Sequence, residues 1–204
     1  QEGRTPWSQG AGHVNPNGAS DPGLVYDLTQ LDYKKYMCGV GIAAQCSSGT
    51  MFGYNLNLPS ITVGNVLGSV TVTRTVKNVS AMGATYNASI SVPGYTATVT
   101  PATLTLAAGE SKPFSVKLVR AGSADNEWQH GALTWTDGTH IVRSPVNARS
   151  GKPVIAPTLV TSDKAAATRI MSVSTGFTGK MNTLYGGLTA VTQTQYSLPQ
   201  AAPG

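Results

Sequence analysis

Three side chains near the end of the strand-rich region have the types that nucleophilic catalysis uses: Asp137, His140 and Ser144. A serine nucleophile works when a histidine within hydrogen-bond reach takes its proton and a carboxylate orients that histidine. His140 and Ser144 would share one face of a strand, where four residues at about 3.3 Å each separate them by about 13 Å. We therefore expect a hairpin turn with a polar face rather than a catalytic triad.

Two further candidates lack the context that catalysis needs. A nucleophilic serine usually sits at a sharp turn into a helix, whose N–H groups face the oxyanion, whereas the Ser47–Ser48 loop leads toward an expected strand. His13 has no carboxylate or thiol at a ligand spacing. We interpret the first as a plain loop and the second as a structural histidine, and we expect no catalytic, cofactor-binding or metal-binding residue in this chain.

The interpretation of the cysteines and of the glycosylation motifs depends on the cellular compartment of the protein. Cys38 and Cys46 lie close together in the sequence. In a secreted chain such a pair predicts a small-loop disulfide, and in a cytosolic chain it predicts two buried thiols. Asn78 and Asn87 each begin an Asn-X-Ser sequon. Both are possible glycosylation sites in a eukaryotic secretory pathway, with chance occurrence in a Ser/Thr-rich chain as the alternative.

The composition limits the class of protein. The chain has 204 residues, enough for one sizeable or two small domains, and only 11% of them are charged. An average soluble protein has about 25%, so hydroxyl groups make this surface polar, as is common in secreted β-rich proteins. The net charge of +5 is spread thinly, and no stretch of 18 apolar residues occurs. We expect a secreted protein with no nucleic-acid partner and no membrane span.

Residues 1–53 combine turns with one short helix. DPG at residues 21–23 and NPNG at residues 15–18 are turn signals, because proline presets φ and glycine accepts a positive φ. Thr29 or Asp32 can cap a helix over residues 31–37. This region buries too little apolar surface to fold alone, so we expect it to pack against something else. The chain also lacks an initiator Met and a signal peptide, which predicts a processed chain or an excised piece.

Residues 54–149 are a succession of strands. The period-two alternation of apolar and polar residues predicts seven of them, and Asp137-Gly138 is a strong hairpin signal between the last two. The expected strands cover residues 70–76, 88–92, 96–100, 104–106, 114–118, 131–136 and 140–146. Seven short strands separated by Pro and Gly turns predict an antiparallel β-sandwich of immunoglobulin or fibronectin type III character.

Residues 150–204 open with the linker composition Gly151-Lys152-Pro153. Residues 169–178 alternate like a strand, but the remainder is rich in Gly, Thr, Gln and Ala. About fifty residues with so few strands cannot enclose a core of their own. We interpret this region as a linker followed by a partial β extension, either cut short or docked onto a neighbour.

Six motifs resemble one known family. They are GAGHVNP (residues 10–16), DPGLVYD (21–27), LNLPSI (56–61), TRTVKNV (73–79), GALTWTDG (131–138) and VRSP (142–145). Together they resemble the end of the catalytic domain, and the fibronectin type III-like domain that follows it, in plant-type subtilisin-like serine proteases and related secreted bacterial members. The family's catalytic Asp, His and Ser precede these motifs, so the resemblance assigns no catalytic role to this chain. It also implies a disulfide between Cys38 and Cys46, as in some relatives.

The resemblance predicts the non-catalytic C-terminal portion of a secreted subtilisin-like endopeptidase. A remnant of an α/β catalytic domain would cover residues 1–53, the sandwich residues 54–149 and the extension residues 150–204. Its partner would be the parent's catalytic domain, and polypeptide substrates through that domain. One alternative is a stand-alone secreted binding or adhesion module, which clustered aromatics would favour; Trp7, Trp128 and Trp135 are scattered in the sequence. Another is a processed fragment that binds or regulates the protease.

Overall fold

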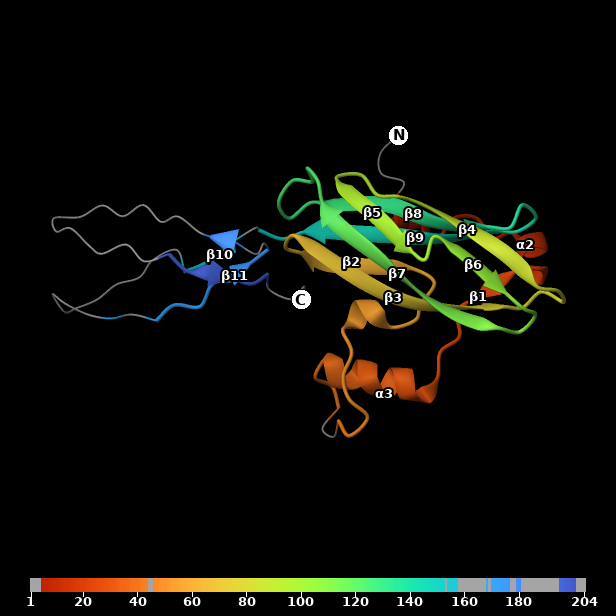
Figure 1. Cartoon of the computed structure of the whole chain (residues 1–204), viewed down its shortest axis with the longest axis horizontal. Coiled ribbons are helices and arrows are strands. Elements are labelled where there is room, and N and C mark those ends of the chain that lie inside the picture. The colour runs from red at the N-terminus through yellow and green to blue at the C-terminus, as the bar shows by residue number, and fades with distance from the viewer. Residues whose placement is uncertain are drawn as a thin grey trace.

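The computed structural model describes residues 5–43, 46–152, 154–157, 168, 170–176, 179–180 and 195–200, and its centre is a pair of β-sheets around one core (Figure 1). One sheet has the order β1-β3-β7-β5 and the other β2-β9-β8-β4-β6. The first consists of β1 (Leu24–Val25), β3 (Ser69–Asn78), β7 (Ser111–Arg120) and β5 (Tyr95–Thr100). The second consists of β2 (Ile61–Val66), β9 (Ile141–Ser150), β8 (Trp128–Thr136), β4 (Ala84–Ser91) and β6 (Thr103–Leu106). The prediction of a mainly β chain built around a sandwich is confirmed.

Alternation along each strand places one face in the core. In β3 the side chains of Val70, Val72 and Val76 are buried, while their neighbours at 71, 73 and 75 are exposed. The core between the sheets includes Trp135 of β8 and Phe114 of β7, whose rings meet edge to face at 5.1 Å. Both side chains are almost fully buried, so the two sheets share one apolar interior.

The sandwich differs from the expectation at β2. This strand was not among those expected, because Gly64 and Asn65 interrupt the alternation of ITVGNV. β2 pairs with β9 in a parallel ladder, with a register irregularity between Val63 and Val66, whereas the other pairs are antiparallel among the described strands. β2 thus lies beside β9 at the edge of the second sheet. The chain then crosses to the first sheet, where it forms β3.

Among the described residues, three helices and a 3-10 turn precede the strand β2: α1 (Pro6–Gln9), α2 (Pro16–Ser20), α3 (Gln30–Gly39) and η1 (Gly53–Asn55). Both residues proposed as the cap of α3 act together, because the backbone N–H of Asp32 donates to Thr29 Oγ1 and that of Thr29 donates to Asp32 Oδ2. The NPNG motif forms a helical turn rather than a plain turn, since Asn15 caps α2 and Pro16 takes its first position.

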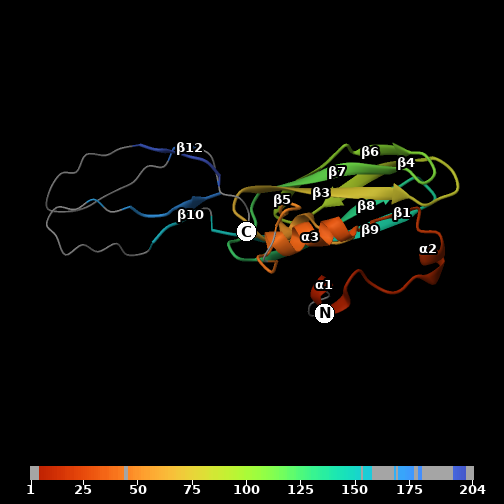
Figure 2. The same cartoon turned by 90° about the horizontal axis from the view of Figure 1, so that it is seen from below.

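The described part of residues 150–204 contains four strands of two residues each. β10 (Val154–Ile155) pairs with β11 (Ser174–Thr175), and β12 (Gly179–Lys180) pairs with β13 (Ser197–Leu198). Figure 1 shows β10 and β11, and Figure 2 shows β10 and β12, at the end of the sandwich opposite α2. Of the alternating run at 169–178, residues 169, 177 and 178 lie outside the described part. Gln200 Nε2 donates to the carbonyl of Ser69 at 2.6 Å, so this region contacts the start of β3. The division of the chain at residues 53 and 149 stays a prediction.

Candidate functional site

The structure brings two of the three triad candidates together and leaves the third apart. His140 Nδ1 donates to Asp137 Oδ2 at 2.7 Å within the turn between β8 and β9. Ser144 lies further along β9, and its Oγ is hydrogen-bonded to the hydroxyl of Tyr26 at 2.9 Å. Ser144 is thus engaged by the N-terminal region rather than by a histidine, which is a structural contact and not the geometry of a nucleophile.

The remaining candidates occupy loops. Ser47 and Ser48 lie in a turn that leads to the 3-10 turn η1 and not to an α-helix, and His13 is exposed. Among the described residues, no group of three or more His, Cys, Asp or Glu side chains is placed to hold a metal ion. None of the helices in that part of the chain has the length and apolar character that crossing a bilayer requires.

The N-terminal region is fastened to the sandwich by its backbone. β1 extends the first sheet, with Leu24 opposite Asn78 and Val25 opposite Lys77. The backbone N–H of Val79 also donates to the carbonyl of Gly23 at 2.9 Å. Leu24 is buried in the common core. Residues 24–25 therefore belong to the sandwich physically, although the motif that contains them lies before the expected start of the sandwich at residue 54.

Arg74 fastens the segment that leads into β2. Its side chain is only 3% exposed and points inward from β3 between Val72 and Val76. The guanidinium donates to four carbonyl oxygens, those of Tyr54, Leu58, Ser60 and Thr73, at 2.8 to 3.0 Å. Burial lowers the pKa of Arg74 to about 10, an effect that the nearby Tyr26 hydroxyl partly offsets. The charge stays buried at neutral pH because these carbonyls replace its water shell.

Polar contacts and rings hold the rest of the N-terminal region. Asn57 Nδ2 donates to the carbonyls of Asp27 and Thr75, each at 2.9 Å, and Asp27 forms an ion pair with Lys77 at 3.3 Å. At the other end, the ring of Trp7 in α1 meets that of Trp128 edge to face at 5.0 Å. The two tryptophans that are scattered in the sequence therefore meet in space, where they attach α1 to β8.

Residues 31–52 expose several large apolar side chains. α3 buries none of its residues, and Figure 1 shows it set off to one side of the sheets. Tyr33, Met37 and Val40 follow one another at helical spacings, so they share one face of the helix. We call the exposed large apolar side chains of this stretch the α3 surface. They are Leu31, Tyr33, Met37, Val40, Ile42 and Phe52, with exposed fractions of 38% to 73%.

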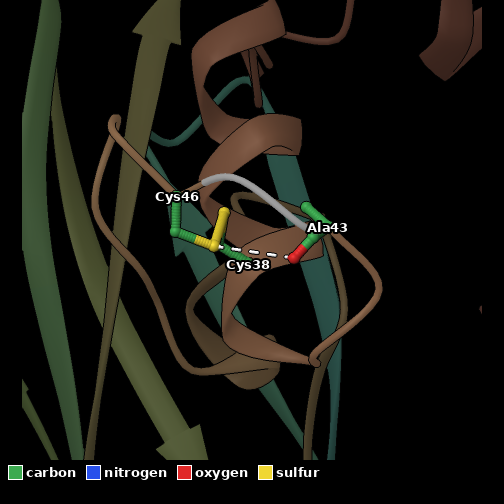
Figure 3. The surroundings of a disulfide bond; sticks show 3 residues. All are labelled: Cys38, Ala43 and Cys46. Carbon is green, nitrogen blue, oxygen red and sulfur yellow. Dashed lines mark hydrogen bonds between the residues drawn. A yellow bond between two sulfur atoms is a disulfide. The ribbon is translucent and has the colours of Figure 1, made fainter.

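A disulfide shapes the α3 surface. Cys38 near the end of α3 is bonded to Cys46, with 5.5 Å between the two Cα atoms (Figure 3). The sulfur of Cys46 lies 3.8 Å from the carbonyl oxygen of Ala43. The expected disulfide is confirmed. It closes a short loop that carries Ile42 and thereby limits the positions that this exposed side chain can take.

The two sequons differ in their surroundings. Asn78 is fully buried, and its Nδ2 donates to the carbonyls of Met82, Leu106 and Ala107. A glycan on that nitrogen would remove these contacts, so the folded chain has no room for one. Asn87 is exposed on β4, where its Oδ1 accepts a hydrogen bond from Thr103. Of the two, only Asn87 remains a candidate for modification.

A comparison with protein-family models identifies the class of the β-sandwich. Residues 55–148 match the family model described as a fibronectin type-III domain. This range runs from η1 to the last part of β9, so the strands that surround Trp135 and Arg74 form a fibronectin type-III domain.

The particular family comes from curated relatives in Arabidopsis thaliana. Subtilisin-like protease SBT5.4 is 45% identical over 154 residues, which cover 69% of this chain and 20% of that protein. SBT5.3 is 43% identical over 157 residues, with 70% and 20% covered, and SBT3.2 is 39% identical over 158 residues, with 71% and 22% covered. The chain therefore belongs to the subtilisin-like proteases as a segment with their fibronectin type III-like domain. It spans about a fifth of the length of these relatives.

Proposed function

We propose that this chain is the non-catalytic C-terminal portion of a larger, secreted subtilisin-like serine endopeptidase, and that it stabilises the catalytic domain by packing against it. The α3 surface carries this proposal. Soluble proteins rarely leave a cluster of large apolar side chains in water, and a helix without any buried residue gains little from the sandwich. A catalytic domain is the partner that fits, because the relatives are named proteases and the chain covers about a fifth of their length.

The attachment of the N-terminal region to the β-sandwich supports a role in stabilising the catalytic domain. Asn57, β1 and the Trp7–Trp128 contact fix one side of this region to the fibronectin type-III domain. A catalytic domain that packs on the other side would thereby be coupled to a preformed β-sandwich. The same arrangement would place the sandwich near the edge of a substrate cleft, so we also propose a contribution to substrate access. Secretion agrees with the disulfide, and we keep Asn87 as a candidate glycosylation site.

A serine-directed fluorophosphonate probe tests the non-catalytic part of this proposal. We expect the 204-residue chain to remain unlabelled and to leave a labelled protein substrate intact, because Ser144 is bonded to Tyr26 and not to a histidine. The full-length parent, treated in parallel, should be labelled once and should cleave the substrate. Mass spectrometry of the labelled peptide locates the modified serine. Labelling of Ser47, Ser48 or Ser144 in the isolated chain would overturn the proposal.

A further inference from the structure

His140 lies between two carboxylates that come from different parts of the chain. Its Nδ1 is 2.7 Å from Asp137 Oδ2 in the β8–β9 turn, and its Nε2 is 3.2 Å from Asp21 Oδ2 in the segment between α2 and β1. Asp137 is fixed in place, since its Oδ1 also accepts the backbone N–H groups of Thr139 and His140. Asp21 reaches the ring from outside, with 70% of its side chain exposed. The imidazole thus connects the N-terminal region to the fibronectin type-III domain.

The backbone beside Asp21 is shaped to approach this ring. Gly23 has a φ of +72°, and a Cβ at this position would lie 2.8 Å from His140 Cγ and 2.7 Å from the hydroxyl oxygen of Tyr86. A side chain there would therefore push the segment off the ring. Tyr86 of β4 is the other titratable group that faces the imidazole, at 6.5 Å between ring centres. Burial raises the pKa of Tyr86, so its hydroxyl stays neutral while the histidine titrates.

Protonation of His140 decides whether the contact with Asp21 is attractive. In the neutral ring the hydrogen bond to Asp137 keeps the proton on Nδ1, so Nε2 presents a lone pair toward the carboxylate of Asp21. In the charged ring both nitrogens carry protons, and each faces a carboxylate. The hydrogen bond to Asp137, followed by the contact with Asp21, raises the pKa of His140 above its ordinary value.

Because folding raises the pKa of His140, the stabilisation that its charged ring provides decreases as the pH rises. A histidine whose pKa is raised by folding contributes its stabilisation fully below its unfolded pKa of about 6.5, and loses it as the pH rises through the folded pKa. Asp137 stays ionised over this range. Burial acts to raise its pKa, but the hydrogen bonds from His140 and Thr139 outweigh burial and hold it well below its usual value.

We propose that His140 is a pH-sensitive clasp, which fastens residues 16–25 to the fibronectin type-III domain in a mildly acidic medium and loosens them in an alkaline one. The clasp acts on the same region that carries the α3 surface. If the proposed docking role holds, the clasp makes the alignment of that surface tighter at acidic pH; its own existence does not depend on that role.

The test compares two variants of the 204-residue chain, Asp21→Asn and the matched control Asp27→Asn. Both remove the charge of an exposed aspartate in the N-terminal region that pairs with the sandwich at similar distance, 3.2 Å to His140 and 3.3 Å to Lys77. The first pair contains a histidine, the side chain whose charge ordinarily changes between pH 5 and 8, and the second does not, so only the first pair should depend on pH. The readout is hydrogen exchange of the Val79 amide, corrected for its intrinsic rate, because this N–H donates to Gly23.

At pH 5.5 we expect Asp21→Asn to lower the protection of Val79 about threefold, as for an exposed ion pair. At pH 8.5 it should have no effect, whereas Asp27→Asn should lower protection by a similar factor at both pH values. The NMR titration midpoint of the His140 imidazole should also fall in Asp21→Asn. Equal effects of Asp21→Asn at both pH values, or an unchanged midpoint, would overturn the clasp. Neither result bears on the docking proposal, because no catalytic domain takes part in this experiment.

Discussion

Replacing Arg74 with methionine is expected to lower the free energy of unfolding of the 204-residue chain by about 3 kcal/mol, the upper value for the loss of one hydrogen bond to a charged group. The guanidinium holds four carbonyls at once, and three of them belong to the segment from Tyr54 to Ser60 that leads into β2. Methionine fills the apolar space between Val72 and Val76 but leaves these carbonyls without their donor. We expect the segment to detach together with part of η1.

The measurement is urea unfolding followed by tryptophan fluorescence, with Arg143→Met as the matched control. Arg143 is exposed, and its Nη1 donates to the carbonyl of Ala11 at 3.1 Å, so its loss should change the free energy of unfolding by less than about 1 kcal/mol. Equal effects of the two substitutions would show that the buried guanidinium is no more important than an exposed one. Arg74→Lys should fall between them, because an ammonium group cannot reach the same set of carbonyls.

Truncating Trp135 to alanine is expected to cost about 3–5 kcal/mol, the usual range for a fully buried tryptophan. Its ring is completely buried and meets Phe114 of the opposite sheet edge to face. Removing it leaves a cavity between the two sheets, and close-packed strands cannot collapse to fill a space of that size. The loss should therefore appear as a lower midpoint of thermal unfolding of the whole sandwich.

Trp128→Ala provides the comparison for this substitution. Trp128 is half-buried at the surface of β8, between Trp7 at 5.0 Å and the guanidinium of Arg149 at 5.3 Å. Losing these contacts should cost about 1–2 kcal/mol and release α1. Differential scanning calorimetry measures the loss of stability that each of the two substitutions causes. A larger loss from Trp128→Ala than from Trp135→Ala would contradict the assignment of the core.

Much of the fold follows from alternation in the sequence. The run that contains β3 places residues 70, 72, 74, 76 and 78 on one face, and the expected core lies there. Arg74 and Asn78 lie on this same face, where the alternation predicts apolar side chains. Two polar residues at such positions are a signal that reasoning from the sequence missed. Because buried polar side chains are almost always hydrogen-bonded, these two positions predict hydrogen-bond networks inside the sandwich. The structure contains such a network at each residue.

Contacts between distant segments could not be derived in this way. The pairing of β2 with β9 depends on which edge of the sheet is free, and local alternation carries no information about that choice. The contact of Asp21 with His140 and that of Tyr26 with Ser144 join residues more than a hundred positions apart. A sequence reveals that Asp137 and His140 are neighbours in a turn, but it cannot show which carboxylate meets the other nitrogen of the ring.

The central claim is that the α3 surface packs against a catalytic domain. Ile42 gives the sharpest test, because 73% of its side chain is exposed in this chain. An exposed position tolerates Asp with a change of less than about 0.5 kcal/mol, whereas a charge buried in an apolar interface costs several times more. Ile141 on the sandwich is 76% exposed and serves as the matched control. The two substitutions should therefore behave alike in the isolated chain and differently in the full-length protease.

The most direct measurement is the half-life of proteolytic activity of the full-length parent at elevated temperature, for the unmodified enzyme, Ile42→Asp and Ile141→Asp. We predict a half-life at least about tenfold shorter for Ile42→Asp, which corresponds to about 1.4 kcal/mol, and an unchanged half-life for Ile141→Asp. Thermal unfolding of the isolated 204-residue chain should be the same for all three. If Ile42→Asp leaves the half-life of the parent unchanged, the α3 surface is not the interface with the catalytic domain.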